Sequence, residues 1–175
     1  VGSAVVMDVN TGAVLACATY PSYDLNTYYQ NYEALSKDKS SPLWNRALMS
    51  TYEPGSTMKP AIAAAGLEEG VITETSKFYC SHIYRQFTDT TFKCLGSHGW
   101  IDVKNALNQS CNIYFYETGR LLGINRMNDY CTRFGLGQKT GVEINESSGV
   151  LAGIAYREAH GGTWYPGDTV QAAIG

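Results

Sequence analysis

The sequence predicts an α+β fold, because a strand-rich opening is followed by a largely helical remainder. Residues 1–7 and 13–19 are small or apolar, and the turn-forming residues 8–12 between them indicate a β-hairpin. Further along the chain, apolar periodicity with capping residues at its ends indicates several helices. An antiparallel sheet packed against helices in layers is the architecture that this order of elements favours.

The elements of the first hundred residues differ in how clearly they are marked. Residues 22–51 are polar and rich in tyrosine, and we expect them to wrap the surface as a loop. An alanine-rich helix is predicted from Ala61 to Glu69, with Gly70 as its C-terminal cap. Residues 71–100 hold two cysteines and two histidines among polar residues, which indicates irregular structure or short strands.

The second part of the chain is predicted to be helical up to Gly135. Asp102 can cap a short helix that runs through Asn108, and after a break the apolar periodicity resumes over residues 113–122. A further helix is expected over residues 125–134. Beyond it, glycine, proline and short apolar runs dominate, so we expect irregular structure there.

Size and composition restrict the class of protein. The chain has 175 residues, of which 44% are hydrophobic, as is usual for one globular domain. Its net charge of −3 comes from thirteen basic and sixteen acidic residues without runs, so we expect neither a nucleic-acid partner nor a polybasic membrane patch. No segment approaches the roughly 18 apolar residues of a membrane span. The chain opens on Val1 without an initiator methionine or signal peptide, and we expect it to be a piece of a longer protein.

A serine and a lysine three residues apart form the first motif. Ser56 and Lys59 follow a Pro-Gly turn, and on a helix such positions share one face, which would let the amine reach the hydroxyl. A lysine takes the proton of a serine only when it is neutral, so the fold must lower its pKa, by burial and by the positive end of the helix dipole. Pro60 should distort the first helical turn. By spacing alone, the pair is more often an N-cap serine followed by a surface lysine.

A second motif, Ser110-Cys111-Asn112, interrupts two predicted helices. Its hydroxyl and carboxamide could converge on a cleft, although serine and asparagine often only cap helices. Taken together, the two motifs and their surroundings resemble the transpeptidase domain of class B penicillin-binding proteins, including the elongation- and sporulation-type enzymes of Gram-positive bacteria. The resemblance extends over nearly all of the chain and rests on residues 4–8, 11–16, 42–47, 52–60, Cys94 with His98-Gly99, 106–112 and 134–137.

The resemblance implies a fold and a site. The fold would be that of the serine β-lactamases and penicillin-binding transpeptidases, an antiparallel sheet with helices on both faces plus a helical subdomain. Ser56 would be the acylated nucleophile and Lys59 its general base. Ser110 and Asn112 would relay protons and hold the amide of the substrate.

A third motif of this family is spelled by Lys139-Thr140-Gly141, but its context differs. The triplet directly follows Phe134-Gly135-Leu136-Gly137 and precedes Val142-Glu143, which matches a loop upstream of the genuine third motif. Residues 167–175 match a later element that still precedes it. We therefore expect residues 1–175 to be a partial transpeptidase domain that lacks the third motif, the later strands, one oxyanion-hole donor and the last helix.

The resemblance also implies a function. The full enzyme would be a peptidoglycan D,D-transpeptidase that attacks D-Ala-D-Ala stem peptides through a serine acyl-enzyme and is acylated by β-lactams. It would need no cofactor and no metal ion, and would act in cell-shape maintenance at the extracytoplasmic face of the bacterial cytoplasmic membrane, with its anchor outside this chain and a glycosyltransferase as a partner. We expect this piece alone to be inactive or impaired. The alternatives are a serine β-lactamase, for which the sequence lacks a Glu-x-x-Leu-Asn element, and a non-catalytic β-lactam sensor or binding domain of the same fold.

The cysteines and tyrosines leave alternatives open. Cys80, His82, Cys94 and His98 could be zinc ligands, but the Cys80–His82 spacing is shorter than usual. A Cys80–Cys94 disulfide could contribute about 3 kcal/mol in the chain-entropy model, and two free thiols fit equally well. Cys111 is expected to pack inward rather than act as a nucleophile. The thirteen tyrosines would suit a surface for sugar or peptide, although a core explains them as well.

Overall fold

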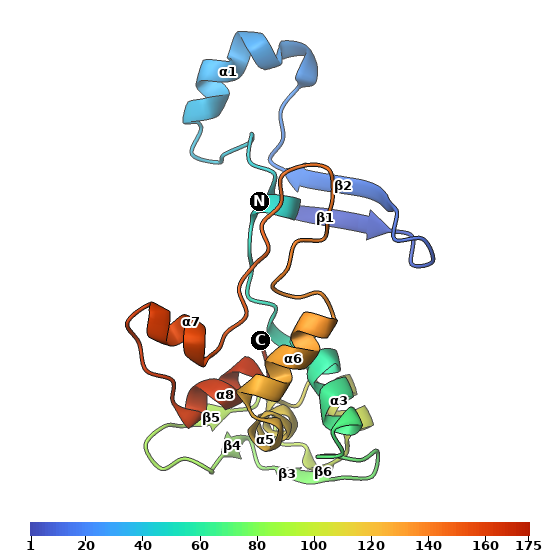
Figure 1. Ribbon diagram of the computed structural model, residues 1–175, viewed down its shortest axis with the longest axis vertical. Coiled ribbons are helices and arrows are strands. Elements are labelled where there is room, and N and C mark those ends of the chain that lie inside the picture. The colour runs from blue at the N-terminus through green and yellow to red at the C-terminus, as the bar shows by residue number, and fades with distance from the viewer. The chain divides into compact units, whose positions relative to one another are not determined.

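The computed structural model describes residues 1–175, which form two compact units. The first, here called the hairpin unit, consists of Val1–Tyr52 and Lys139–Ser148. The second, the helical unit, consists of Glu53–Gln138 and Gly149–Gly175 and carries both predicted motifs. The predicted α+β class is confirmed (Figure 1). No helix combines the length and the apolar character that a membrane crossing requires.

The hairpin unit opens on the predicted β-hairpin. Strands β1 (Gly2–Met7) and β2 (Val14–Tyr20) pair antiparallel, and the register shifts by a bulge next to Met7. The turn between them forms because the Asp8 carboxylate accepts the backbone N–H groups of Asn10 and Thr11 at 2.7 and 3.2 Å. Helix α2 (Arg46–Met49) packs against both strands.

The expected loop over residues 22–51 is wrong in part, because it contains helices. A 3-10 turn, η1 (Leu25–Thr27), leads into helix α1 (Tyr28–Lys37). Residues 28–37 contain neither glycine nor proline, and the Lys37 ammonium lies 2.6 Å from the Glu33 carboxylate one turn earlier. Residues 28–37 therefore form a helix although they are mostly polar, because no helix breaker interrupts them. Residues 38–45 form neither helix nor strand.

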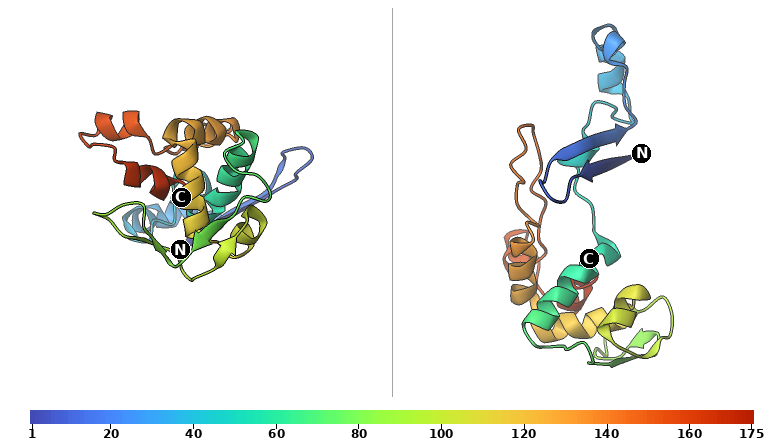
Figure 2. Two further views of the ribbon diagram at one scale, coloured as in Figure 1. Left: turned by 90° about the horizontal axis from the view of Figure 1, so that it is seen from below. Right: turned by 90° about the vertical axis from the view of Figure 1, so that its right-hand side faces the viewer.

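The helical unit is built around helix α5 (Asn112–Leu122). Helices α3 (Lys59–Glu68), α6 (Ile124–Arg133) and α8 (Pro166–Ala172) pack against it, as Figures 1 and 2 show. Gly119 allows the close approach of α8, since a Cβ at this position would lie 2.4 Å from the Cβ of Ala173. The largest apolar side chains that are fully buried in this core are Tyr114, Phe115, Ile62, Ile72, Met127 and Val170.

Short strands connect the first and second helices of this unit, as predicted for residues 71–100. Strand β3 (Phe78–Cys80) pairs antiparallel with β6 (Gly99–Ile101), and β4 (Ile83–Tyr84) pairs antiparallel with β5 (Phe92–Lys93). The β3–β6 pair packs on α5 through β3. These strands hold the residues around the second motif in place.

The helix ends agree with the capping residues named from the sequence. Gly70 follows α3 with a φ of 67°, in the left-handed region that glycine adopts readily. The Asp102 carboxylate accepts the Asn105 N–H at 2.9 Å and so caps α4 (Val103–Asn108). The irregular structure expected after residue 135 is wrong for α7 (Ile154–Ala159) and α8. Helix α8 is capped by the Asp168 carboxylate, which accepts the Tyr165 N–H at 2.8 Å.

Candidate active site

The turn that carries Ser56 is a 3-10 turn rather than the start of an α-helix. This turn, η2, covers Gly55–Met58, and α3 begins at Lys59. Pro60 has no N–H to donate to the Ser56 carbonyl, and the Lys59 N–H donates to it instead, one residue earlier. The distortion predicted from Pro60 is therefore present. It leaves Ser56 exposed while Lys59 enters the core.

The second motif lies in a tight turn between α4 and α5. Ser110 has a φ of 51°, in the left-handed region that non-glycine residues rarely adopt, and the Cys111 N–H donates to the Ala106 carbonyl at 2.9 Å. The chain thereby reverses within two residues, and α5 begins at Asn112. This turn brings both oxygens of Ser110 within hydrogen-bonding distance of Lys59.

One hydrogen-bonded chain joins the four predicted site residues. The Lys59 ammonium donates to the Ser110 carbonyl at 2.8 Å, to the Ser110 hydroxyl at 3.0 Å and to Asn112 Oδ1 at 2.6 Å. The Ser110 hydroxyl in turn donates to Ser56 Oγ at 2.9 Å. Lys59 makes no direct hydrogen bond to Ser56, and the connection runs through Ser110.

The environment of Lys59 favours the neutral amine. The side chain is 1% exposed, and burial lowers the pKa of Lys59, partly opposed by the nearby thiols of Cys94 and Cys111. The Phe115 ring, whose centroid lies 5.7 Å from the Lys59 nitrogen, also opposes the effect of burial, because an aromatic face stabilises the ammonium. A lysine with a lowered pKa, joined to an exposed serine through a hydroxyl, is an arrangement that can activate a serine nucleophile.

Asn112 is oriented by bonds at both ends of its carboxamide. Its Oδ1 accepts from Lys59, and its Nδ2 donates to the Lys93 carbonyl on β5 at 3.2 Å. The carboxamide therefore helps to fix the lysine in its place. The resemblance assigns Asn112 to the amide of the substrate. Its contact with Lys59 leaves no signal in the motif itself, because it depends on the packing of α5 against α3.

Comparisons with known proteins identify the family of the chain. A family model described as the penicillin binding protein transpeptidase domain matches residues 2–175. The chain belongs to this transpeptidase family.

Relatives of this transpeptidase domain come from several bacteria. The peptidoglycan D,D-transpeptidase MrdA of Salmonella typhimurium (strain SL1344) is 36% identical over 183 residues, covering 97% of this chain and 29% of the relative. Stage V sporulation protein D of Bacillus subtilis (strain 168) is 32% identical over 151 residues, covering 85% and 22%. The chain thus spans less than a third of the length of these relatives.

Solved structures share the fold of the transpeptidase domain. Pseudomonas aeruginosa PBP2 in complex with WCK 5153 matches with a TM-score of 0.91 and 35% identity, covering 99% of this chain and 42% of that chain. Helicobacter pylori PBP2 in complex with MreC matches with a TM-score of 0.92 and 29% identity, covering 99% and 34%. The fold class expected from the resemblance is confirmed by these structures.

The Lys139-Thr140-Gly141 triplet of the transpeptidase domain lies in the hairpin unit. The backbone N–H groups of Thr140 and Gly141 both donate to the Glu146 carboxylate at 2.9 Å, and the Thr140 hydroxyl donates to it at 2.8 Å. These bonds hold the pKa of Glu146 below its usual range. The polar groups of Thr140 and Gly141 are thus engaged in closing a local turn.

Four side chains that could bind a metal ion meet at the second motif, and one of them, Cys111, is part of it. The ligand atoms of Cys80, Cys94, His98 and Cys111 all lie within 4.8 Å of one another. His98 Nδ1 lies 3.4 Å from Cys80 Sγ and 3.7 Å from Cys94 Sγ. Three thiols and one imidazole in this arrangement fit tetrahedral Zn²⁺.

The structure excludes one of the alternatives that the cysteines left open. All five cysteines are free thiols, so the Cys80–Cys94 disulfide is not formed. His82 lies outside the cluster, and Cys111, expected only to pack inward, takes its place. No signal in the sequence marks Cys111 as a member of the cluster, because its partners are distant in the chain and come together only in the fold.

Proposed function

We propose that this domain carries the serine-acylation site of a peptidoglycan D,D-transpeptidase. The observation that carries the proposal is the hydrogen-bonded chain from exposed Ser56 through Ser110 to buried Lys59. Support also comes from relatives named peptidoglycan D,D-transpeptidase at 36% and 34% identity. Residues 1–175 would form one part of the transpeptidase domain, with the third motif elsewhere in the full protein.

The proposed reaction begins with proton transfer from the nucleophile. Ser56 Oγ attacks the carbonyl of the penultimate D-alanine, while its proton passes to the Ser110 oxygen and the Ser110 proton passes to neutral Lys59. A hydroxyl can rotate and donate in either direction. When Lys59 is charged, it donates to Ser110 and Ser110 donates to Ser56. When Lys59 is neutral, Ser56 donates to Ser110 and Ser110 donates to Lys59. The C–N bond then breaks, D-alanine leaves with the returned proton, and an ester remains on Ser56.

Transfer completes the cycle. The amine of a neighbouring stem peptide attacks the ester carbonyl, loses a proton to the same chain, and forms the cross-linking amide as Ser56 regains its hydrogen. The first turn of α3 places its positive dipole end near the nucleophile and would stabilise the developing oxyanion. Asn112 would keep the Lys59 amine directed at Ser110.

β-Lactams would acylate Ser56 in the same way. A PBP2 relative was solved in complex with WCK 5153, and another in complex with MreC.

We propose that the full protein acts in the cell envelope, at the extracytoplasmic face of the cytoplasmic membrane, with a glycosyltransferase as a partner in cell-wall synthesis. A serine β-lactamase of the same fold is disfavoured by the relatives, which are named as transpeptidases.

The test is covalent labelling of the full-length protein by a fluorescent penicillin. We expect one label per wild-type molecule and none on the Ser56→Ala variant, while Ser36→Ala, which changes an exposed serine on α1, should label normally. Label retained on Ser56→Ala would contradict the assignment of the nucleophile. Continuous hydrolysis of nitrocefin by the wild type would indicate a β-lactamase instead.

We also propose that Cys80, Cys94, His98 and Cys111 bind a structural Zn²⁺. The Asn112 N–H donates to Cys94 Sγ at 3.3 Å, so an ion held here would fix the start of α5 and with it the second motif. Elemental analysis of the full-length protein should find one zinc per molecule. A Cys111→Ser variant should lose it, whereas Cys17→Ser, at an exposed thiol in the hairpin unit, should keep it. Equal zinc content in both variants would exclude the site.

A further inference from the structure

A pocket lies on the helical unit, apart from the candidate active site. It has a volume of about 390 Å³ and lies between strands β3, β4 and β6 and helix α5. None of the residues Ser56, Lys59, Ser110 and Asn112 lines it. The pocket, here called the aromatic pocket, is defined by Lys77, Tyr79, Tyr84, Arg85, Trp100 and Glu117.

Two exposed aromatic rings form one wall of the aromatic pocket. Tyr79 and Trp100 are directly opposite each other in the β3–β6 pair, and their ring centroids lie 5.5 Å apart. They are 57% and 70% exposed. Paired aromatic rings left open to solvent beside a cavity are a surface to which flat, partly apolar ligands bind, because the rings offer a large apolar area at little entropic cost.

The floor of the pocket contains a buried hydroxyl without a partner. Tyr84 is 4% exposed, and its hydroxyl lies beside Glu117 and Arg120 without a hydrogen bond of good geometry to either. Burial raises the pKa of Tyr84, Glu117 adds to the effect and Arg120 partly opposes it, so the hydroxyl keeps its proton and can donate. A buried polar group without a partner costs about 1–3 kcal/mol. A ligand oxygen that reached the Tyr84 hydroxyl would remove that cost.

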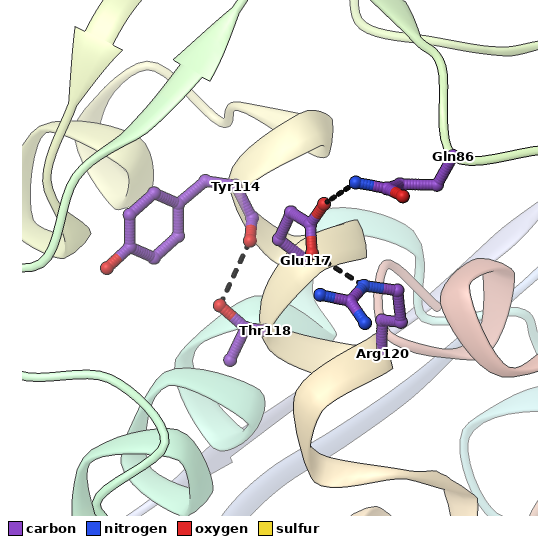
Figure 3. Close-up of polar contacts among 5 residues, drawn as sticks. All are labelled: Gln86, Tyr114, Glu117, Thr118 and Arg120. Carbon is purple, nitrogen blue, oxygen red and sulfur yellow. Dashed lines mark hydrogen bonds and ion pairs between the residues drawn. The ribbon is translucent and has the colours of Figure 1, made fainter.

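Another wall of the aromatic pocket contains Glu117, whose carboxylate is oriented by two hydrogen bonds. Glu117 on α5 accepts from Gln86 Nε2 at 3.0 Å and from Arg120 Nε at 2.7 Å, and its side chain is 12% exposed (Figure 3). Below it on the same helix, the Thr118 hydroxyl donates to the Tyr114 carbonyl at 2.9 Å, which leaves Thr118 no part in the pocket (Figure 3). Glu117 is therefore a fixed acceptor for hydroxyl or amide N–H groups.

The charges around the pocket favour an anion. Lys77 and Arg85 line it and take part in no ion pair, whereas the charge of Glu117 is offset by Arg120. The charge of Lys77 also acts on the Asp102 carboxylate, so the excess of positive charge at the edge of the pocket comes mainly from Arg85. Its ligand should combine a ring with apolar C–H faces, hydroxyl or amide groups, and a carboxylate.

We propose that the aromatic pocket binds an anionic, N-acetylated saccharide, namely the glycan strand of peptidoglycan with a carboxylate of its attached peptide. A pyranose ring would lie against Tyr79 and Trp100, its polar groups would bond to Tyr84 and Glu117, and the carboxylate would meet Lys77 or Arg85. The choice of peptidoglycan as the source of the saccharide rests on the proposed function. The pocket would hold the strand while its peptide reacts elsewhere on the domain.

Binding of a soluble disaccharide muropeptide to the full-length protein tests this proposal. Trp100→Ala and Tyr79→Ala should each weaken binding about tenfold, as expected when one aromatic contact of a binding surface is removed. Trp100→Tyr should bind nearly as well as the wild type. Tyr29→Ala, which removes an 89% exposed tyrosine of the hairpin unit, should bind like the wild type.

A second probe separates stacking from charge. Chitotetraose is neutral, so the Lys77→Gln/Arg85→Gln double variant should weaken the muropeptide and leave chitotetraose unchanged, whereas Trp100→Ala should weaken both. Binding within twofold of wild type in both aromatic variants would overturn the proposal, as would a wild type that binds neither probe.

Penicillin labelling of the same proteins keeps the two proposals distinct. The aromatic variants should label like the wild type, which also shows that they are folded. If the wild type binds the muropeptide through Trp100 but is not labelled, the proposed function fails and the saccharide pocket stands. Normal labelling without muropeptide binding overturns the pocket and leaves the proposed function intact.

Discussion

Replacing Ser110 by alanine tests whether Lys59 acts through the second serine. In the structure the Ser110 hydroxyl is bonded to both Ser56 and Lys59, at 2.9 and 3.0 Å, and alanine removes both bonds. A positioned acid–base group contributes about 10²–10⁴-fold to a rate. That range corresponds to about 2.7–5.4 kcal/mol of activation free energy. We expect acylation of Ser110→Ala to slow by that factor.

Folding should be affected far less than acylation. Lys59 keeps two acceptors, the Ser110 carbonyl and Asn112 Oδ1, so the free energy of unfolding should fall by only about 0.5–1.5 kcal/mol. Ser110→Gly is the matched control, because glycine adopts the φ of 51° without strain and also lacks the hydroxyl. If the hydroxyl is what matters, both variants lose the same activity.

The assay is the second-order rate constant for acylation of the full-length protein by a chromogenic β-lactam. Thermal unfolding of each variant is measured in parallel. A loss below tenfold in Ser110→Ala would refute the relay, because it would show that Lys59 activates Ser56 directly. Recovery of activity in Ser110→Gly would show that the turn, not the hydroxyl, controls the rate.

Three further predictions concern pH, packing and capping. The acylation rate should rise with pH, because only the neutral amine of Lys59 accepts a proton. It should level off at a pH below the usual pKa of lysine, because burial lowers the pKa of Lys59. A rate that levels off only near the usual pKa of lysine would contradict the lowered pKa. Gly119→Ala should destabilise the protein by about 1–3 kcal/mol in chemical denaturation, and adding Ala173→Gly should restore most of it, since the two Cβ atoms would lie 2.4 Å apart. Asp102→Ala should cost about 1 kcal/mol through the lost cap of α4, and an unchanged unfolding midpoint would show that the cap is not needed.

The elements that the sequence predicted correctly are those with local causes. The β1–β2 turn follows from Asp8, the start of α4 from Asp102, and the end of α3 from Gly70. Each of these residues acts on backbone groups within a few positions of itself. The same holds for the distorted turn before α3, where Pro60 lacks the N–H that an α-helix would need.

The features that could not be predicted depend on contacts between distant segments. Helix α8 has no strong periodicity of its own and forms where Gly119 of α5 leaves room for it. The direct contact of Lys59 with Ser56 that the three-residue spacing predicts on an α-helix is not formed, because the chain is a 3-10 turn at Ser56. The relay through Ser110 was implied only by the resemblance. Cys111 joins Cys80 in one cluster only after the β3–β6 pair and the Ser110 turn have formed.

The contrast in exposure between Ser56 and Lys59 has a consequence for how the protein exchanges protons with its surroundings. Ser56 faces solvent, but the amine that would receive its proton is inside the core and reached through one hydroxyl. Dissolved buffer bases therefore have no access to Lys59 itself. In the proposed mechanism the proton that Lys59 gains during acylation would stay inside the protein and would be the one that returns to the departing amine.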